Sequence, residues 1–81
     1  MGSQIICMSL LEKAADYVIY EFGNSMKDLD GKMKLSLRNP REEFVILEES
    51  QIGPMETLRA HSKLARVIEQ GETPEKVCRA S

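Results

Sequence analysis

The sequence predicts a small α+β domain with the order helix, strand, strand, helix, short C-terminal helix (αββαα), in which the two strands form an antiparallel hairpin. Three observations predict it: helix-forming residues open the chain, apolar and polar residues alternate in the middle, and a Gly-Pro pair precedes an amphipathic segment. The 81 residues are expected to form one domain, residues 1–81, because two smaller units could not each close a core.

The first predicted element is a helix over residues 4–22, a stretch in which helix-forming residues dominate. Ser3 is an acceptable N-cap, and Gly23 followed by Asn24 is typical of a helix end. Placed at about 100° per residue, the apolar side chains cover a broad arc of this helix. One small sheet cannot cover so wide an arc, which predicts burial on two sides and hence a partner molecule or self-association.

A β-hairpin is predicted after a loop at residues 24–31, which is rich in turn-forming residues. Residues 32–38 alternate between apolar and polar or cationic side chains, the pattern of a half-buried strand. Asn39 and Pro40 favour a reversal, and residues 42–49 return as a second strand with apolar side chains on both faces. A lone hairpin is marginal in water, so we expect either another subunit to extend the sheet beside this strand or two layers of helix to enclose it.

An amphipathic helix is predicted over residues 54–70, with Pro54 at its first position and Gly71 directly after its end. Thr73 and Pro74 then favour the start of a short C-terminal helix, as N-cap and first helical residue. These two elements complete the predicted order.

His61, the single histidine of the chain, lies within the apolar stripe of the 54–70 helix and is expected to point inward. Burial disfavours the charged ring, so His61 is expected to be neutral and to bond a backbone carbonyl, a tyrosine hydroxyl or a glutamate. Replacement by Leu should leave the fold intact, provided that this bonding partner can reach water. One histidine and two distant cysteines do not suffice for a catalytic triad or a zinc site, so we predict no enzyme activity, no metal and no cofactor.

Charge and cysteine content indicate the class of protein, and the cysteine content favours a cytoplasmic one. The 11 basic and 13 acidic residues give a net charge of −2, without the overall positive field of a dedicated nucleic-acid-binding protein. Cys7 and Cys78 form no C-x-x-C motif and are expected to be reduced thiols, with a Cys7–Cys78 disulfide as the alternative. The uncharged run over residues 1–11 fits neither a signal peptide nor a membrane span.

These patterns predict a non-catalytic regulator or adaptor that acts as a homodimer and binds another protein, and no membrane. The candidate partner-binding residues lie on the first helix and the second strand: Tyr17, Tyr20, Phe22, Phe44 and Ile46. The alternative is a small DNA- or RNA-binding transcriptional or post-transcriptional regulator that uses the basic face of the hairpin: Lys32, Lys34, Arg38 and Arg41. Salt distinguishes the two, because phosphate binding weakens steeply as salt rises.

Overall fold

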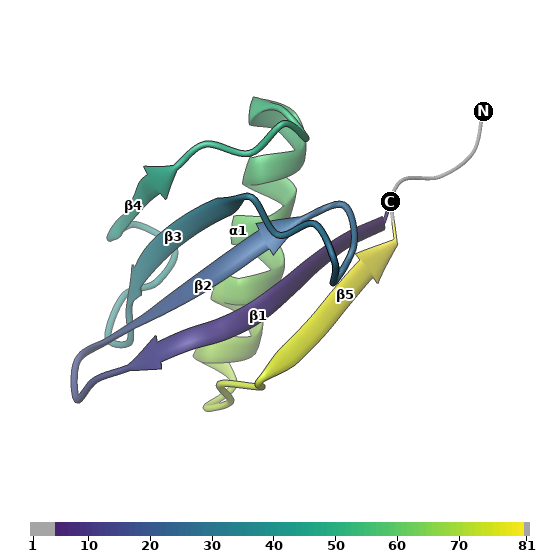
Figure 1. Ribbon diagram of the computed structural model, residues 1–81. Helices are drawn as coiled ribbons and strands as arrows, with labels where there is room; N and C mark the ends of the chain where they lie inside the picture. The colour runs from purple at the N-terminus through teal and green to yellow at the C-terminus, as the bar shows by residue number, and fades with distance from the viewer. Residues whose placement is uncertain (1–4, 81) are drawn as a thin grey trace.

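The computed structural model describes residues 5–80, which form a five-stranded antiparallel sheet with one helix across one face (Figure 1). The strands and the helix are, in chain order, β1 (Ile5–Lys13), β2 (Tyr17–Gly23), β3 (Gly31–Ser36), β4 (Phe44–Glu48), α1 (Pro54–Glu69) and β5 (Lys76–Ala80). The strand order in the sheet is β4-β3-β2-β1-β5, so four strands form a meander and β5 returns beside β1. Within residues 5–80, no helix is long and apolar enough to cross a membrane.

The predicted helix over residues 4–22 is wrong, because residues 5–23 form the β1–β2 hairpin. The segment YVIYEF in β2 is rich in β-branched and aromatic residues, which favour a strand. Alternation along the two strands then divides the broad apolar arc between two faces of a sheet. The predicted N-cap Ser3 and the first predicted helical residue, Gln4, lie outside the described residues.

The predicted short C-terminal helix is also wrong, because residues 76–80 form β5. Val77 packs against the core while Lys76 and Cys78 are exposed, which is the alternation of a strand with one buried face. Thr73 and Pro74 lie in the connection from α1 to β5. The αββαα order is therefore replaced by ββββαβ, a mostly β fold to which the term α+β applies only loosely.

The β3–β4 hairpin and the helix after it are confirmed. Pro54 occupies the first turn of α1, and Gly71 after its end has a φ of +87°, a conformation that favours glycine. β4 is the outermost strand on its side of the sheet, with Val45 and Leu47 exposed. The expected covering of both faces of this strand is therefore absent within residues 5–80.

The core lies between α1 and the inner face of the sheet. The side chains that the strands contribute to it are all 0% exposed: Ile6, Met8, Val18, Tyr20, Phe22, Met33 and Leu35. They form one cluster with residues of the helix: Ala60, Leu64, Val67 and Ile68. Full burial of a large apolar side chain contributes about 1.5–3 kcal/mol, so this layer is the main stabilising contact of the fold.

The hydroxyl of Tyr20 is satisfied within this core, because it donates a hydrogen bond of 2.5 Å to the carbonyl of Pro74. Burial raises the pKa of Tyr20 to about 12, since the charged form would lose its hydration. The bond links the centre of the sheet to the connection that leads into β5.

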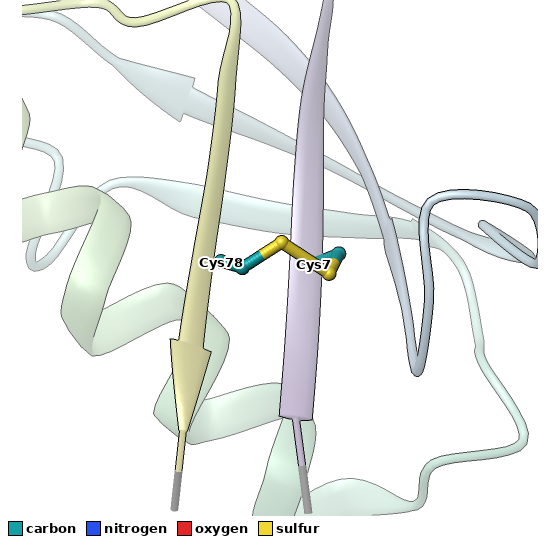
Figure 2. Close-up of a disulfide and its surroundings, with 2 residues drawn as sticks. All are labelled: Cys7 and Cys78. Atoms are coloured by element: carbon teal, nitrogen blue, oxygen red, sulfur yellow. A yellow bond between two sulfur atoms is a disulfide. The ribbon is translucent and has the colours of Figure 1, made fainter.

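A disulfide joins Cys7 of β1 to Cys78 of β5 (Figure 2). The two residues lie directly opposite each other in the antiparallel pairing, with Cα atoms 4.1 Å apart. The prediction of reduced thiols is wrong, because the sheet brings together two cysteines that are 71 positions apart in the chain. The weaker alternative, a Cys7–Cys78 disulfide, is the one that the structure contains.

Candidate binding surface on the open face of the sheet

The sheet face that points away from α1, which we call the outer face, is not covered by a helix (Figure 1). Register places polar side chains in one row across four strands: Ser9, Glu21, Lys32 and Glu48. The next row mixes apolar and cationic side chains: Ile19, Lys34 and Val45. The outer face therefore presents apolar and charged groups side by side, as protein-binding surfaces do.

The loop over residues 24–30 turns back closely over the end of β2. An added Cβ at Gly23 would collide with the backbone carbonyl of Asp28, so only glycine allows this close approach. Cys7, opposite Gly23 in the β1–β2 pairing, is 5% exposed. The accessible part of the outer face thus lies toward the other end of the sheet and toward β4.

A groove of about 540 Å³ lies on the outer face beside β2, β3 and β4. Its acidic side chains are Asp16, Glu42 and Glu43, and its basic side chains are Lys34 and Arg38. This mixture of charges suits a partner that brings both polar and apolar groups, rather than a ligand of one charge.

Tyr17 lies in this groove and is held by two contacts. Its hydroxyl donates a 2.6 Å hydrogen bond to Oε2 of Glu12, and the ammonium group of Lys34 lies 4.4 Å from the centre of its ring. The bond to the carboxylate of Glu12, followed by the negative charge of that group, raises the pKa of Tyr17. These two contacts hold the ring in place on the outer face.

The structure distributes the predicted partner-binding residues over three environments. Tyr17 lies on the outer face, whereas Tyr20 and Phe22 lie in the core with no exposed surface. Phe44 and Ile46 are half-buried and pack against the core from β4. Of these five side chains, Tyr17 alone belongs to the outer face.

β4 leaves half of its backbone groups unpaired, because it pairs with β3 on one side only within residues 5–80. The N–H of Ser36 donates to the carbonyl of Glu43 (2.9 Å), which fixes the phase of the antiparallel ladder. Val45, two positions further on, therefore exchanges hydrogen bonds with β3. The N–H and C=O groups of Phe44 and Ile46 therefore point away from β3, on the side where the sheet of residues 5–80 has no further strand.

Sequence reasoning missed two residues of this surface. Val45 and Leu47 are 56% and 47% exposed, yet the second predicted strand was expected to be covered on both faces. A signal was present in the sequence, because glutamates flank the apolar centre at both ends: Glu42, Glu43, Glu48 and Glu49. Charged residues at the ends of a short apolar strand are typical of a sheet edge.

The four cations of the predicted nucleic-acid site do not form one surface. Lys32 forms an ion pair of 3.4 Å with Glu48, and the ammonium group of Lys34 forms a cation–π contact with the ring of Tyr17. Arg38 lines the groove with Lys34. Carboxylates thus alternate with the cations on the outer face.

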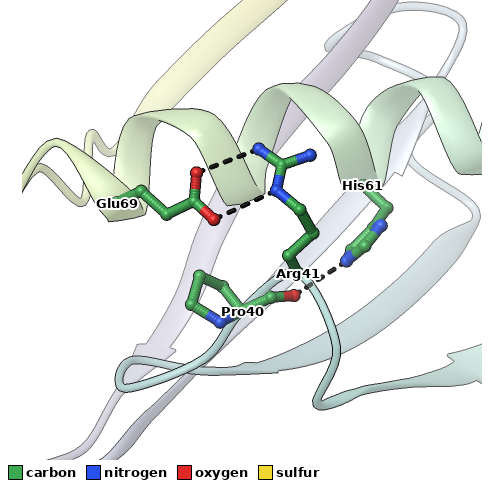
Figure 3. A network of polar contacts seen from close by, with 4 residues as sticks. All are labelled: Pro40, Arg41, His61 and Glu69. Carbon is green, nitrogen blue, oxygen red and sulfur yellow. Dashed lines mark hydrogen bonds and ion pairs between the residues drawn. The ribbon is translucent and has the colours of Figure 1, made fainter.

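Arg41 points to α1 instead, where its Nε and Nη2 donate to both carboxylate oxygens of Glu69 at 3.0 and 2.9 Å (Figure 3). This bidentate ion pair raises the pKa of Arg41 and lowers the pKa of Glu69. Arg41 therefore holds the β3–β4 connection to the helix.

The chain has no significant match among protein families, curated proteins or solved structures. Within residues 5–80, no group of three His, Cys, Asp or Glu side chains could hold a metal ion. The outer face and the open edge of β4 are therefore the candidate functional surfaces of the described residues.

His61 fixes the β3–β4 connection from the inner side (Figure 3). Its Nε2 donates to the carbonyl of Pro40 at 2.8 Å, and its ring stacks on Phe44 with centroids 3.6 Å apart. His61 is 7% exposed, and its pKa lies below the ordinary value, mainly because burial disfavours the charged ring. The prediction of an inward, neutral histidine is confirmed, and of the three bonding partners that were considered the backbone carbonyl is the one present.

Proposed function

We propose that the protein is a non-catalytic regulator or adaptor that binds another protein through the outer face and the open edge of β4. The observation that carries the proposal is the exposure of Val45 and Leu47 on a strand whose backbone is unpaired on one side. Exposed apolar side chains beside free backbone groups are what proteins use when they bind a partner by adding a strand.

A homodimer was predicted from the wide apolar arc of a first helix and from the apolar side chains on both faces of the second strand. That arc is divided between two sheet faces, and α1 covers the inner one. The apolar side chains of β1 and β2 on the inner face therefore need no second copy to cover them. In our proposal the partner is a different protein, and a homodimer is an outcome that sedimentation would detect.

A matched pair of double variants tests the proposed surface. Val45→Lys with Leu47→Lys changes β4, whereas Met55→Lys with Leu58→Lys changes two apolar side chains of α1 that are 66% and 55% exposed. Both variants remove two exposed apolar side chains and add two positive charges. Each is immobilised, and the proteins that it retains from an extract of the native cells are quantified.

We expect the β4 variant to retain at least about tenfold less of the partner than the wild type, because charges in the centre of an interface disfavour binding. The α1 variant should retain as much as the wild type, and circular dichroism should show that both variants are folded. Equal retention by all three proteins would contradict the proposed surface.

Nucleic-acid binding remains the alternative, and a salt titration tests it. Lys34→Gln with Arg38→Gln removes two cations of the outer face. If the alternative holds, affinity for DNA or RNA falls steeply as salt rises and weakens further in this variant. The carboxylates that alternate with the cations on this face favour the protein partner, for which neither behaviour is expected.

The cytoplasmic location predicted from the sequence rested on free thiols. A disulfide persists mainly in oxidising compartments, so the Cys7–Cys78 bond favours such a compartment for this protein. Alkylation of free thiols at the moment of cell lysis, followed by mass spectrometry, tests this. Unlabelled Cys7 and Cys78 are expected, and full labelling of both would return the protein to a reducing compartment.

A further inference from the structure

We propose that the partner contributes an extended strand with an apolar centre and a basic residue at each end, and that this strand pairs with β4. The inference rests on the proposed function and specifies the chemistry of the partner. Three features of β4 carry it: the phase of its free backbone groups, the apolar side chain between them and the glutamates at its two ends.

The backbone of β4 is arranged to accept one more antiparallel strand. The free N–H and C=O groups of Phe44 and Ile46 would bond the incoming strand. Val45 lies between them, so the incoming residue opposite Val45 would form a non-hydrogen-bonded pair, the type in which side chains approach most closely. An apolar residue is therefore favoured at that position, because Val45 is exposed on the outer face.

The negative charge beside β4 favours basic residues at the two ends of the incoming strand. Residues 42–49 contain four glutamates and no lysine or arginine, and all four glutamates are exposed: Glu42, Glu43, Glu48 and Glu49. Opposite charges across neighbouring strands stabilise pairing, and like charges destabilise it. Lysine or arginine at both ends of the incoming strand would thus be complementary to β4.

A second copy of this chain does not have that complementarity. In an antiparallel self-pairing centred on Val45, residues equally far before and after Val45 lie opposite each other. Glu42 of one copy therefore lies opposite Glu48 of the other, because each is three positions from Val45. A self-pairing centred on Ile46 places Glu43 opposite Glu49 in the same way. Two-fold symmetry makes each repulsive contact occur twice. The glutamates therefore oppose self-association and favour a cationic strand.

Three synthetic peptides of about nine residues test the inference. They share the centre Thr-Val-Thr-Val-Thr and end in two lysines, two serines or two glutamates on each side. Affinity for the intact, oxidised protein is measured by titration, and backbone amide exchange is followed by nuclear magnetic resonance. We expect the lysine-ended peptide to bind at least about tenfold more tightly than the serine-ended one, and the glutamate-ended peptide not to bind.

Amide exchange identifies the binding edge. On binding, the amide protons of Phe44 and Ile46 should become protected, whereas that of Val45, already bonded to β3, should change little. Protection at β5, the other edge of the sheet, without protection at Phe44 and Ile46 would overturn the inference. Equal affinity for lysine-ended and serine-ended peptides would also overturn it.

A charge reversal with a matched control completes the test. Glu43→Lys with Glu49→Lys reverses two charges beside β4, and Glu72→Lys with Glu75→Lys reverses two exposed glutamates near the start of β5. In the first variant the preference for the lysine-ended peptide should be lost, because the two new lysines offset Glu42 and Glu48, whereas the control should keep this preference. The same preference in both variants would overturn the inference.

Failure of the inference can be told from failure of the proposed function. If no peptide binds, yet Val45→Lys with Leu47→Lys still loses the partner from the extract, the outer face stands and strand pairing is overturned. If the double variant retains the partner fully, the proposed function is itself contradicted, whatever the peptides do.

Discussion

At residue 61, the histidine contributes a hydrogen bond that leucine cannot provide. Leucine was expected to be tolerated if the bonding partner could reach water, but Pro40, whose carbonyl accepts this bond, is fully buried. We therefore expect His61→Leu to lower the free energy of unfolding by about 1–3 kcal/mol, because a buried carbonyl loses its donor. Denaturant unfolding measures this, with Ser62→Leu at an exposed neighbouring position as the control. Equal stability of His61→Leu and wild type would contradict the role assigned to the bond.

The same histidine should make stability depend on pH. Its pKa in the folded protein lies below the ordinary 6.5, so the unfolded chain takes up the proton first as pH falls. The contribution of neutral His61 to the free energy of unfolding is complete above pH 6.5. It is lost as the pH falls from 6.5 toward the lower pKa that His61 has in the folded protein.

A hydrogen bond from Ser50 lowers the pKa of Asp30 from 3.8, and hydrogen bonds from Arg41 lower the pKa of Glu69 from 4.5. These two carboxylates therefore change the stability only at a lower pH than His61 does. Denaturant unfolding of wild type between pH 6.5 and about 5 should therefore show falling stability, and His61→Gln should remove most of the slope. An identical slope in both proteins would contradict this assignment to His61.

Among the elements, α1 and the β3–β4 hairpin were predictable because their signals are local. Pro54 and Gly71 mark the ends of α1, and its apolar stripe places His61 on the inner side. Alternation predicts β3 directly. The position of β4 at the edge depends on pairings between distant segments, and the glutamates at its two ends are only a weak local signal of it. The exposure of Val45 and Leu47 was missed for that reason.

β1, β2 and β5 were misassigned for two different reasons. The turn between β1 and β2 consists of Ala14, Ala15 and Asp16, with no glycine or proline to interrupt a helical pattern. A strand buried on parts of both faces also resembles a helix with a wide apolar arc. β5 has five residues, too few for periodicity to decide, and its partner β1 lies at the other end of the chain.

The disulfide between β1 and β5 should contribute strongly to stability. Replacement of Cys7 and Cys78 by serine should lower the free energy of unfolding by about 2–5 kcal/mol, because the bond closes a long loop and restricts the unfolded chain. Thermal or denaturant unfolding measures this. Reductant should destabilise the wild type by a similar amount and leave the double variant unaffected. A wild type that is insensitive to reductant would exclude a stabilising disulfide.

For the molecule as a whole, α1 covers the inner face of the sheet, so the apolar side chains of that face lie in the core and need no second copy to cover them. The glutamates at both ends of β4 also oppose pairing with a second copy. We therefore expect the isolated protein to sediment as a monomer. A stable dimer in sedimentation velocity would contradict this, and loss of that dimer in Val45→Lys with Leu47→Lys would locate the contact at β4.

The bond between Cys7 and Cys78 closes residues 7–78 into a covalent ring. A protease that cuts once within any surface loop between them would leave the two fragments attached, and gel electrophoresis would separate them only after reduction. Ile5 and Ala80 lie opposite each other in the sheet, so tags fused at either end would emerge from the same corner of the protein. A circularly permuted chain, with its old ends joined and a new opening in a loop, should accordingly retain the same fold.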